Sequence, residues 1–416
     1  MTADHPDEHR TSFGHDRADG ETVEALLSTE SSEQTTKAAR SALFPLYAAG
    51  FVTAFGAHSI AAGLGGYLES GHASLITLGL LLAVYDGAEV VLKPVFGSLA
   101  DRVGPRPVLL GGLLAFAVAS VAFVLAGNPA LVGAARLGQG AAAAAFSPAA
   151  GALVARLTPQ TGHGRAFGGY GAWKGLGYTL GPVLGGVLIT LGGYPLLFGA
   201  LGVLAVAVAA WAALAVPAVS PLPRARQTVL DLARRLGTGS FLRPTLALAG
   251  ATAALAVGVG FLPVAGAGHG LGPLVTGALV SLLAATAALV QPRVGRAYDA
   301  GRIGDGPGMA AGLALAAAGM AVAGVLPGLA GLVGAAVLIG AGTGLVTPIG
   351  FAHLAKGAPP ERLGQTMGAA EVGRELGDAG GPLLVGALAA AAGALSFGLI
   401  GLAVVLAALA AVVARR

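Results

Sequence analysis

The chain has 416 residues, of which 55% are hydrophobic and 11% charged, and it contains no cysteine. Its mean hydropathy is +0.78. A soluble globular domain carries about 25% charged residues, so the low charged fraction and the high hydropathy together exclude this class. The missing cysteines exclude disulfides and thiolate chemistry, and the net charge of +4 comes from basic residues scattered through short loops, which argues against nucleic-acid binding.

Residues 1–40 hold 9 of the 20 acidic residues and no apolar core. We expect a disordered cytoplasmic tail there, because a cleaved signal peptide would need an apolar segment. Twelve apolar stretches follow that are long enough to cross a bilayer. They predict spans at about residues 42–66, 74–98, 106–126, 129–155, 166–191, 194–217, 244–267, 272–296, 308–327, 329–354, 365–391 and 395–414.

The longest interruption is residues 218–243, between the sixth and seventh spans. It contains basic residues and an amphipathic pattern, so we expect a cytoplasmic linker lying on the membrane surface. The basic residues are Arg224, Arg226, Arg234, Arg235 and Arg243, and the apolar ones are Val229, Leu232, Ala233 and Leu236. The segments on either side, residues 41–217 and 244–416, are then two helical bundles.

Basic residues predict the orientation. The loops after even-numbered spans contain Lys or Arg, whereas the loops after odd-numbered spans contain none. Because cytoplasmic loops are enriched in these residues, both termini are predicted to be cytoplasmic.

Unusual residues recur about 200 positions apart. Gly181-Pro182 returns as Gly381-Pro382, Lys174 as Arg374, Ser147-Pro148 as Thr347-Pro348, and Asp101 as Asp299. Polar and helix-breaking residues would not repeat in this way by chance in four apolar segments. The repeat indicates a duplicated membrane bundle, the way many secondary transporters are built.

Three segments carry motifs with a physical meaning. The loop Gly97-Ser-Leu-Ala-Asp101-Arg102-Val-Gly104-Pro-Arg106 allows a tight turn, and it places Asp101 where it can meet the positive N-terminus of a neighbouring helix. Arg102 and Arg106 are then expected at the lipid headgroups.

The fourth span contains Arg136, Gln139 and Gly140, and an arginine within a span is costly unless it faces protein or water. The fifth span contains Gly177, Gly181, Pro182, Gly185 and Gly186, a small-residue face with a proline kink that suits close helix packing.

These segments resemble motifs A, B and C of the major facilitator superfamily, with Pro105 in place of the first basic residue after Gly104 in motif A. In that family, motif C marks antiporters, particularly the twelve-span drug:proton antiporters. The second half keeps degraded copies of motif A around Asp299 and of motif C from Gly377 to Pro382. The resemblance covers all twelve spans and implies an all-α integral membrane fold of two pseudo-symmetric six-helix bundles. Spans two, five, eight and eleven would flank their interface.

Few ionisable residues lie within the spans. Those of span two share one helix face, as do most of those in span eleven, and the two faces would oppose each other across the cleft. The alternative is local pairing inside each helix. Proton coupling needs buried carboxylates with nearby bases, so the candidates for coupling and gating are Asp86, Glu89, Lys93, Lys174, Glu371, Arg374, Glu375 and Asp378.

A small set of ring side chains could line a substrate cavity: Phe55, His58, Tyr85, Phe146, Tyr170, Trp173 and Tyr178. The histidines lack metal-site spacing, no phosphate-binding loop is present, and no catalytic constellation is evident, so neither metal, nor cofactor, nor enzymatic activity is expected. The resemblance implies a monomeric, multi-pass transporter of the plasma membrane. It would export a small organic molecule, a drug-like compound or a metabolite, in exchange for protons by rocker-switch alternating access, with multidrug resistance as one outcome. A nutrient or metabolite importer on the same fold, as symporter or uniporter, remains the alternative.

Overall fold

The computed structural model describes residues 41–59, 75–126, 128–221, 223, 234, 237–326 and 328–415. The predicted tail lies outside the described residues, as does half of the predicted linker. All regular structure in the described part is helical. After a first helix over residues 41–59, the helices are α2 (Leu75–Val103), α3 (Pro105–Ala122), α4 (Pro129–Leu157), α5 (His163–Ala215), α7 (Gly239–Gly268), α8 (Pro273–Asp299), α9 (Asp305–Val325), α10 (Gly328–Gly357), α11 (Leu363–Ala392) and α12 (Leu395–Ala414).

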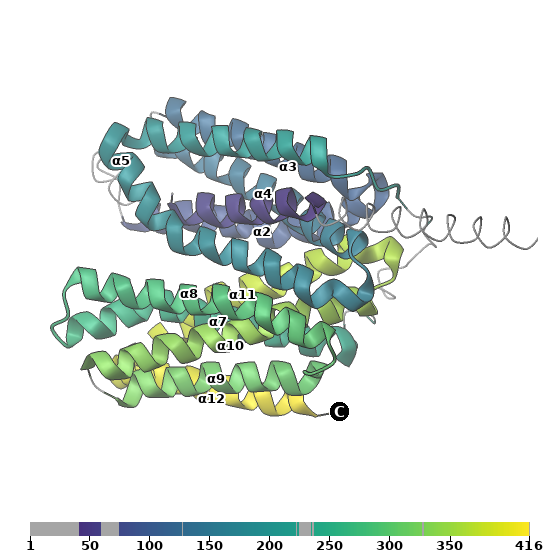
Figure 1. Cartoon of the computed structure of the whole chain (residues 1–416). Helices are drawn as coiled ribbons and strands as arrows, with labels where there is room; N and C mark the ends of the chain where they lie inside the picture. The colour runs from purple at the N-terminus through teal and green to yellow at the C-terminus, as the bar shows by residue number, and fades with distance from the viewer. Residues whose placement is uncertain are drawn as a thin grey trace, which may run out of the picture.

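Helix α5 consists of two helices that meet at a sharp kink. Gly192 and Gly193 leave helical geometry there, and Gly193 has a φ of 68°. Only glycine adopts such a backbone conformation without strain. The chain reverses direction at this point (Figure 1), so α5 contains the segments predicted as the fifth and sixth spans.

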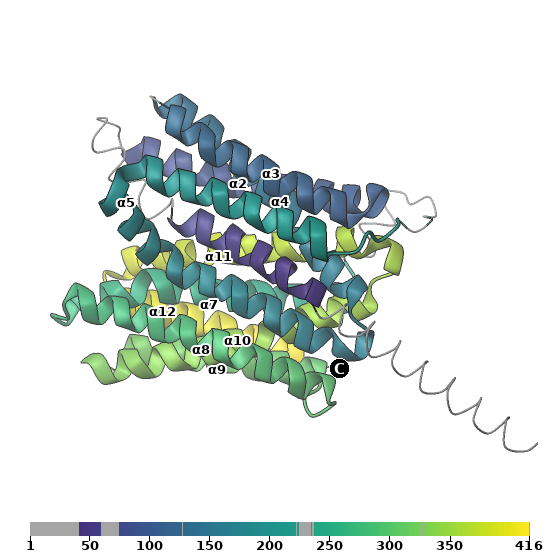
Figure 2. The ribbon, with the colours of Figure 1, turned by 45° about the horizontal axis from the view of Figure 1, so that its top comes forward.

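The helices form two groups that lie side by side. The first helix and α2–α5 make one group, and α7–α12 make the other (Figures 1 and 2). Between the groups, α2 packs against α11 and α5 packs against α8. Sequence segments almost 300 residues apart are therefore brought together in the middle of the molecule.

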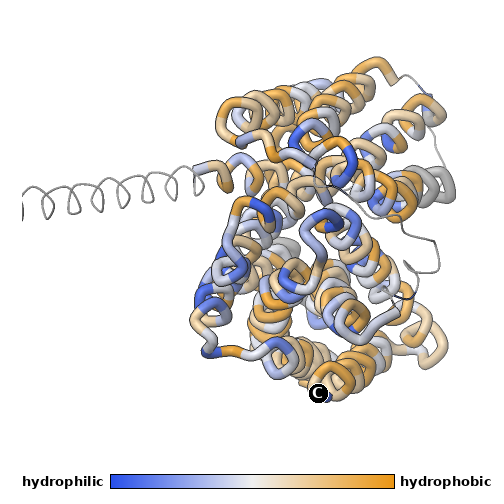
Figure 3. Tube along the Cα trace, turned by 90° about the vertical axis from the view of Figure 1, so that its right-hand side faces the viewer, coloured by the Kyte–Doolittle hydropathy of each residue, from blue (hydrophilic) through white to orange (hydrophobic). Residues whose placement is uncertain are grey.

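Eight helical stretches among the described residues are long and apolar enough to cross a membrane. Helices α2 and α11 are not among them, and each carries several ionisable residues. Large apolar side chains cover the outside of the molecule, such as Leu214, Val203 and Leu383. Hydrophilic residues instead gather in loops at one end of the bundle (Figure 3). This distribution is that of a multi-pass membrane protein.

Candidate functional site

The loop end of α2 is joined to the beginning of α11 by Asp101. Its Oδ1 and Oδ2 accept hydrogen bonds from the backbone N–H groups of Gly364 and Gln365, both at 2.8 Å. Asp101 is 1% exposed, and Arg156 Nη2 lies 3.9 Å from its Oδ1. The contact expected from motif A is thus present: a carboxylate satisfies unpaired donors at a helix N-terminus and interacts favourably with the helix dipole. Gly104 of the same motif has a φ of 97° and begins α3, a turn that favours glycine.

Asp299 makes the equivalent contact in the second half. Its carboxylate accepts hydrogen bonds from Gly164 N at 2.8 Å and Arg165 N at 2.7 Å, at the start of α5. Glycines allow the backbones to approach at both places. A Cβ on Gly97 would collide with the carbonyl of Gly364, and one on Gly295 would collide with the carbonyl of Gly164.

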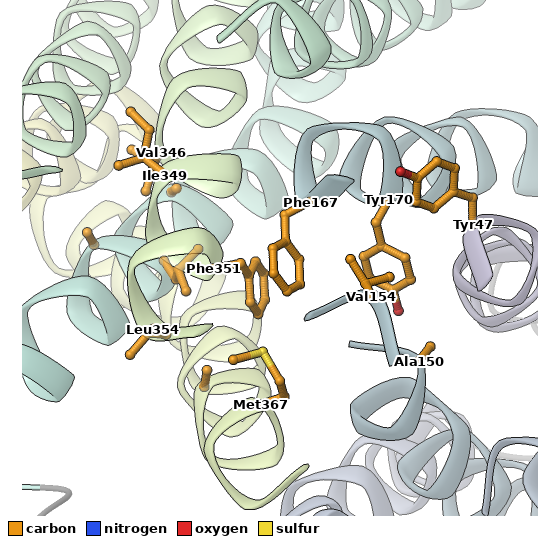
Figure 4. Packing of buried hydrophobic residues seen from close by; sticks show 14 of the residues in the cluster. Tyr47, Ala150, Val154, Phe167, Tyr170, Val346, Ile349, Phe351, Leu354 and Met367 are labelled. Carbon is orange, nitrogen blue, oxygen red and sulfur yellow. The ribbon is translucent and has the colours of Figure 1, made fainter. Parts of the chain in front are cut away.

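Apolar side chains fill the space between these two contacts. Phe167 of α5 stacks on Phe351 of α10, with ring centroids 5.6 Å apart. Met367 of α11 packs against Gly151 of α4, beside Ala150 and Val154 (Figure 4). Together with the two aspartate contacts, this packing closes the loop end of the interface between the two helix groups.

A buried charge network lies farther along the same interface. Lys93 of α2 forms ion pairs with Glu89 of its own helix and with Glu375 of α11, the latter at 2.5 Å. Its Nζ is also 3.7 Å from Glu371. Glu371 in turn contacts Lys174 of α5 at 3.1 Å and Arg374 at 3.3 Å. The structure therefore contains both arrangements considered from the sequence, pairing within a helix and pairing between the opposed faces.

Asp86 and Asp378 lie outside this set of ion pairs. Asp86 is exposed and Asp378 is half-buried, and each lies close enough to Glu375 to interact electrostatically with it. Arg136 of motif B is 2% exposed, and its guanidinium sits 4.4 Å from the centre of the Tyr85 ring on α2. Gln139 donates a hydrogen bond to Ser120 at 3.0 Å, and Gly140 packs on the backbone of Tyr85. Motif B thus fixes α4 against α2 next to the network.

Three of the motif C glycines face the first helix. A Cβ on Gly177 would lie 2.6 Å from Phe51 O, one on Gly181 would lie 3.1 Å from Phe55 O, and one on Gly185 would lie 2.7 Å from Ser59 Cβ. Gly186 faces open space. Gly377 and Gly381 pack in the same way on Ala249 and Ala253 of α7, so the repeat seen in the sequence is a repeated helix contact.

A small cavity, with room for water-sized groups of about 40 Å³, lies beside the charge network. Of the ring side chains proposed from the sequence, Tyr170 and Tyr178 line it. His58 packs edge-on against Tyr178, with centroids 4.3 Å apart. Four others occupy different positions: Phe55 stacks on Phe51, Phe146 packs on Phe116, Trp173 lies against Tyr47, and Tyr85 lies under Arg136. These four serve packing between helices instead of lining the cavity.

Sequence reasoning missed several polar side chains that line this cavity. Besides Lys174 and Arg374, its polar lining includes Thr179 of the first half and Thr252, Gln291, Thr343 and Thr347 of the second half. The repeat could have pointed to Gln291, since Lys93-Pro94 corresponds to Gln291-Pro292 at the 198-residue offset that relates Asp101 to Asp299. The structure supports this correspondence: Gly368 packs on the backbone of Lys93, and Gly168 packs on that of Gln291.

A family-level sequence match shows which protein superfamily the chain belongs to. The sequence model of the Major Facilitator Superfamily matches residues 46–300 and 246–416. The chain therefore belongs to this superfamily.

Curated relatives match over a shorter stretch. The quinolone resistance protein NorA of Staphylococcus aureus is 32% identical over 130 residues, which cover 31% of this chain and 34% of NorA. The class C tetracycline resistance protein of Escherichia coli is 38% identical over 112 residues, which cover 26% of this chain and 28% of that protein. The match spans only about a third of the length of these relatives.

Solved structures share the fold over almost the whole chain. The human organic anion transporter MFSD10 (TETRAN) has a TM-score of 0.75 at 19% identity, covering 90% of this chain and 98% of that one. The Escherichia coli fucose:proton symporter FucP has a TM-score of 0.73 at 14% identity, with the same two coverages. At these identities the likeness shows the fold alone.

Proposed function

We propose that the chain is a secondary active transporter that exports a small organic molecule, a drug-like compound or a metabolite, in exchange for protons. The buried charge network between α2, α5 and α11 carries this proposal, because Lys93 and Lys174 reach carboxylates on α11, a helix of the other group. The motif C glycines and the resistance proteins among the relatives support export.

Rocker-switch movement accounts for the paired aspartate contacts. Asp101 and Asp299 join opposite groups at the same end of the molecule, so both contacts must break when that end opens. We propose that this end is cytoplasmic, that the described state is the one closed to the cytoplasm, and that both termini lie on the cytoplasmic side of the plasma membrane. We further propose that the chain has twelve spans in two bundles, residues 41–217 and 244–416. It would act as a monomer. Because the chain has no cysteine, single introduced cysteines probed from either side of the membrane test the topology directly.

Coupling would arise from exchange of partners within the network. A carboxylate at this depth must be either paired or protonated, and movement of α11 relative to α2 separates Glu375 from Lys93. A carboxylate that loses its partner gains affinity for a proton. In this way, the number of protons bound by the network carboxylates would depend on which end of the transporter is open.

Proton symport is the second candidate, and the cavity lining favours it. Among the described residues that line the cavity, Lys174 and Arg374 are the ionised ones. An anion beside protonatable carboxylates binds more tightly when they are protonated, and by linkage it promotes their protonation. Such a substrate would travel together with protons.

Everted membrane vesicles distinguish the two candidates. A screen of cells with and without the gene, across chemically diverse toxic compounds, first supplies a substrate. In vesicles with an acidic lumen, an antiporter accumulates this substrate inside, whereas a symporter releases preloaded substrate together with protons. Absence of any effect of the pH gradient on either movement would contradict proton coupling.

A further inference from the structure

The cavity beside the charge network differs from the network itself in the sign of its charge. Lys174 and Arg374 line the cavity, while the carboxylate that pairs with both, Glu371, is absent from its described lining. Lys174 and Arg374 are 4% and 7% exposed. Two cations thus face the cavity, and the compensating charge lies behind them.

The two cations are equivalent in the repeat, since Lys174 lies on α5 and Arg374 lies 200 positions later on α11. They converge on one carboxylate from opposite helix groups. Glu371 Oε2 receives Lys174 Nζ at 3.1 Å, and Arg374 Nη1 lies 3.3 Å from both of its oxygens. This arrangement holds a carboxylate between the two groups, where a transporter must hold its substrate.

Both cations have donor capacity beyond these contacts. A guanidinium has five N–H donors and an ammonium has three. Arg374 uses Nη1 for Glu371 and Nε for Thr252 Oγ1, at 3.3 Å, and Lys174 uses one donor for Glu371. Arginine binds carboxylates through two parallel hydrogen bonds when geometry permits.

The remaining lining fits the body of such a molecule. Phe167, Phe351, Leu255, Val259 and Val280 supply apolar walls. Hydroxyl groups of Thr252, Thr343 and Thr347 and the amide of Gln291 lie around them. A small number of polar groups on an apolar surface is typical of a site that orients a largely apolar ligand.

We propose that the cavity binds an organic anion with an apolar body, whose carboxylate is held by Lys174 and Arg374 in competition with Glu371. This substrate class rests on the proposed transport function and, by the linkage argument given above, fits its symport form. Glu371 acts as the internal ligand that occupies the cations in the empty state, and a substrate carboxylate takes its place.

The test measures binding to the purified full-length protein at pH 7, by calorimetry, with matched probes. These are 2-naphthoate and 4-phenylbutyrate, each beside its methyl ester and a primary amine of the same size. We expect the carboxylates to bind at least about tenfold more tightly than the esters and amines, since hydrogen bonds to charged groups are the stronger ones. Equal or tighter binding of the esters or amines, or no binding of either carboxylate, overturns the proposal.

Variants separate recognition from structural support. Arg374→Gln and Lys174→Gln should each weaken carboxylate binding at least about tenfold, and Arg296→Gln, an exposed arginine at the end of α8, should leave it unchanged. Glu371→Gln should tighten carboxylate binding because it removes the competing charge. A structural role alone would not produce this gain, so unchanged or weaker binding in Glu371→Gln contradicts the proposal even where the cation variants fold poorly.

Binding and transport are read independently. Carboxylate binding without any pH-driven movement of these compounds would contradict the proposed proton coupling and leave the anion site standing. Proton-driven transport of a neutral or cationic compound, in a protein that binds no carboxylate probe, would do the reverse.

Discussion

Asp101 and Asp299 each hold the N-terminus of a helix from the other group. Each carboxylate accepts two backbone hydrogen bonds, with distances of 2.7–2.8 Å, and a hydrogen bond to a charged group contributes about 1.5–3 kcal/mol. In the proposed rocker-switch cycle these contacts break when the loop end opens. They would then stabilise the closed state relative to the open one.

Asp101→Asn should consequently slow transport at least about tenfold while expression stays near normal, since an asparagine keeps one acceptor and loses the charge. Transport is measured in proteoliposomes. Opening of the closed end is followed with Met367→Cys, a buried position between α4 and α11, whose maleimide reactivity should rise in the variant. Asp299→Asn should act in the same direction, and Glu361→Gln on the same end serves as control. A wild-type rate and unchanged reactivity would show that the contact does not control opening.

Arg136 presents its charge to the face of Tyr85, at 4.4 Å. A cation over an aromatic face at a desolvated site is worth about 2 kcal/mol, and Arg136 also contributes positive charge near Asp86 and Glu89. Arg136→Ala should abolish proton-coupled transport, whereas Arg136→Lys should restore part of it. Binding and pH-driven efflux are measured for both, with exposed Arg293→Ala as control. If Arg136→Ala retained both proton coupling and substrate affinity, the role of Arg136 would be structural.

The sequence predicted helix contacts better than it predicted the cavity. Motifs A and C consist of glycines and a carboxylate whose requirements are local: close backbone approach and unpaired N–H groups. The cavity instead depends on which side of each helix faces its neighbours across the interface. The orientation of each helix places Phe55 and Phe146 in packing clusters and brings Thr343 and Gln291 to the cavity. A single sequence does not reveal this orientation when all faces of a helix are apolar.

Within motif C, the structure separates glycines that share one sequence pattern. Gly177→Val should lower the thermal stability of the purified protein, because its side chain would meet Phe51 O and Ala54 Cβ, and overpacking costs about 1–3 kcal/mol. Gly186→Val, which faces open space, should be close to neutral. Equal loss of stability in both variants would mean that the first helix is not the partner of this face.

Across the whole molecule, the two halves share their helix contacts and differ in their charges. On the α2–α11 side, Lys93 lies near Glu371. At the equivalent positions on the α5–α8 side, Gln291 replaces the lysine and Gly171 replaces the glutamate, and the Gln291 side chain lies against Gly171. The closing contacts are thus duplicated, while the ionisable groups are concentrated on α2 and α11, with Lys174 reaching them from α5. A symmetric rocking motion would then act on an asymmetric set of charges, which allows one interface to carry the proton while both interfaces open and close.

If the chain exchanges protons as proposed, this asymmetry predicts that coupling depends on Asp86, Glu89, Glu375 or Asp378. Neutralising the coupling carboxylate, with Glu89→Gln and Asp378→Asn as first choices, should abolish pH-driven efflux and preserve downhill exchange of substrate, because the site would still bind and still rock. Both activities are measured in the same vesicles. A carboxylate that only supports the fold, as Glu89 would if its pair with Lys93 were purely structural, should lower thermal stability instead. If all four single neutralisations leave pH-driven efflux intact, the proton binds elsewhere, with His58 behind Tyr178 the next group to replace, or the transporter is not coupled to protons.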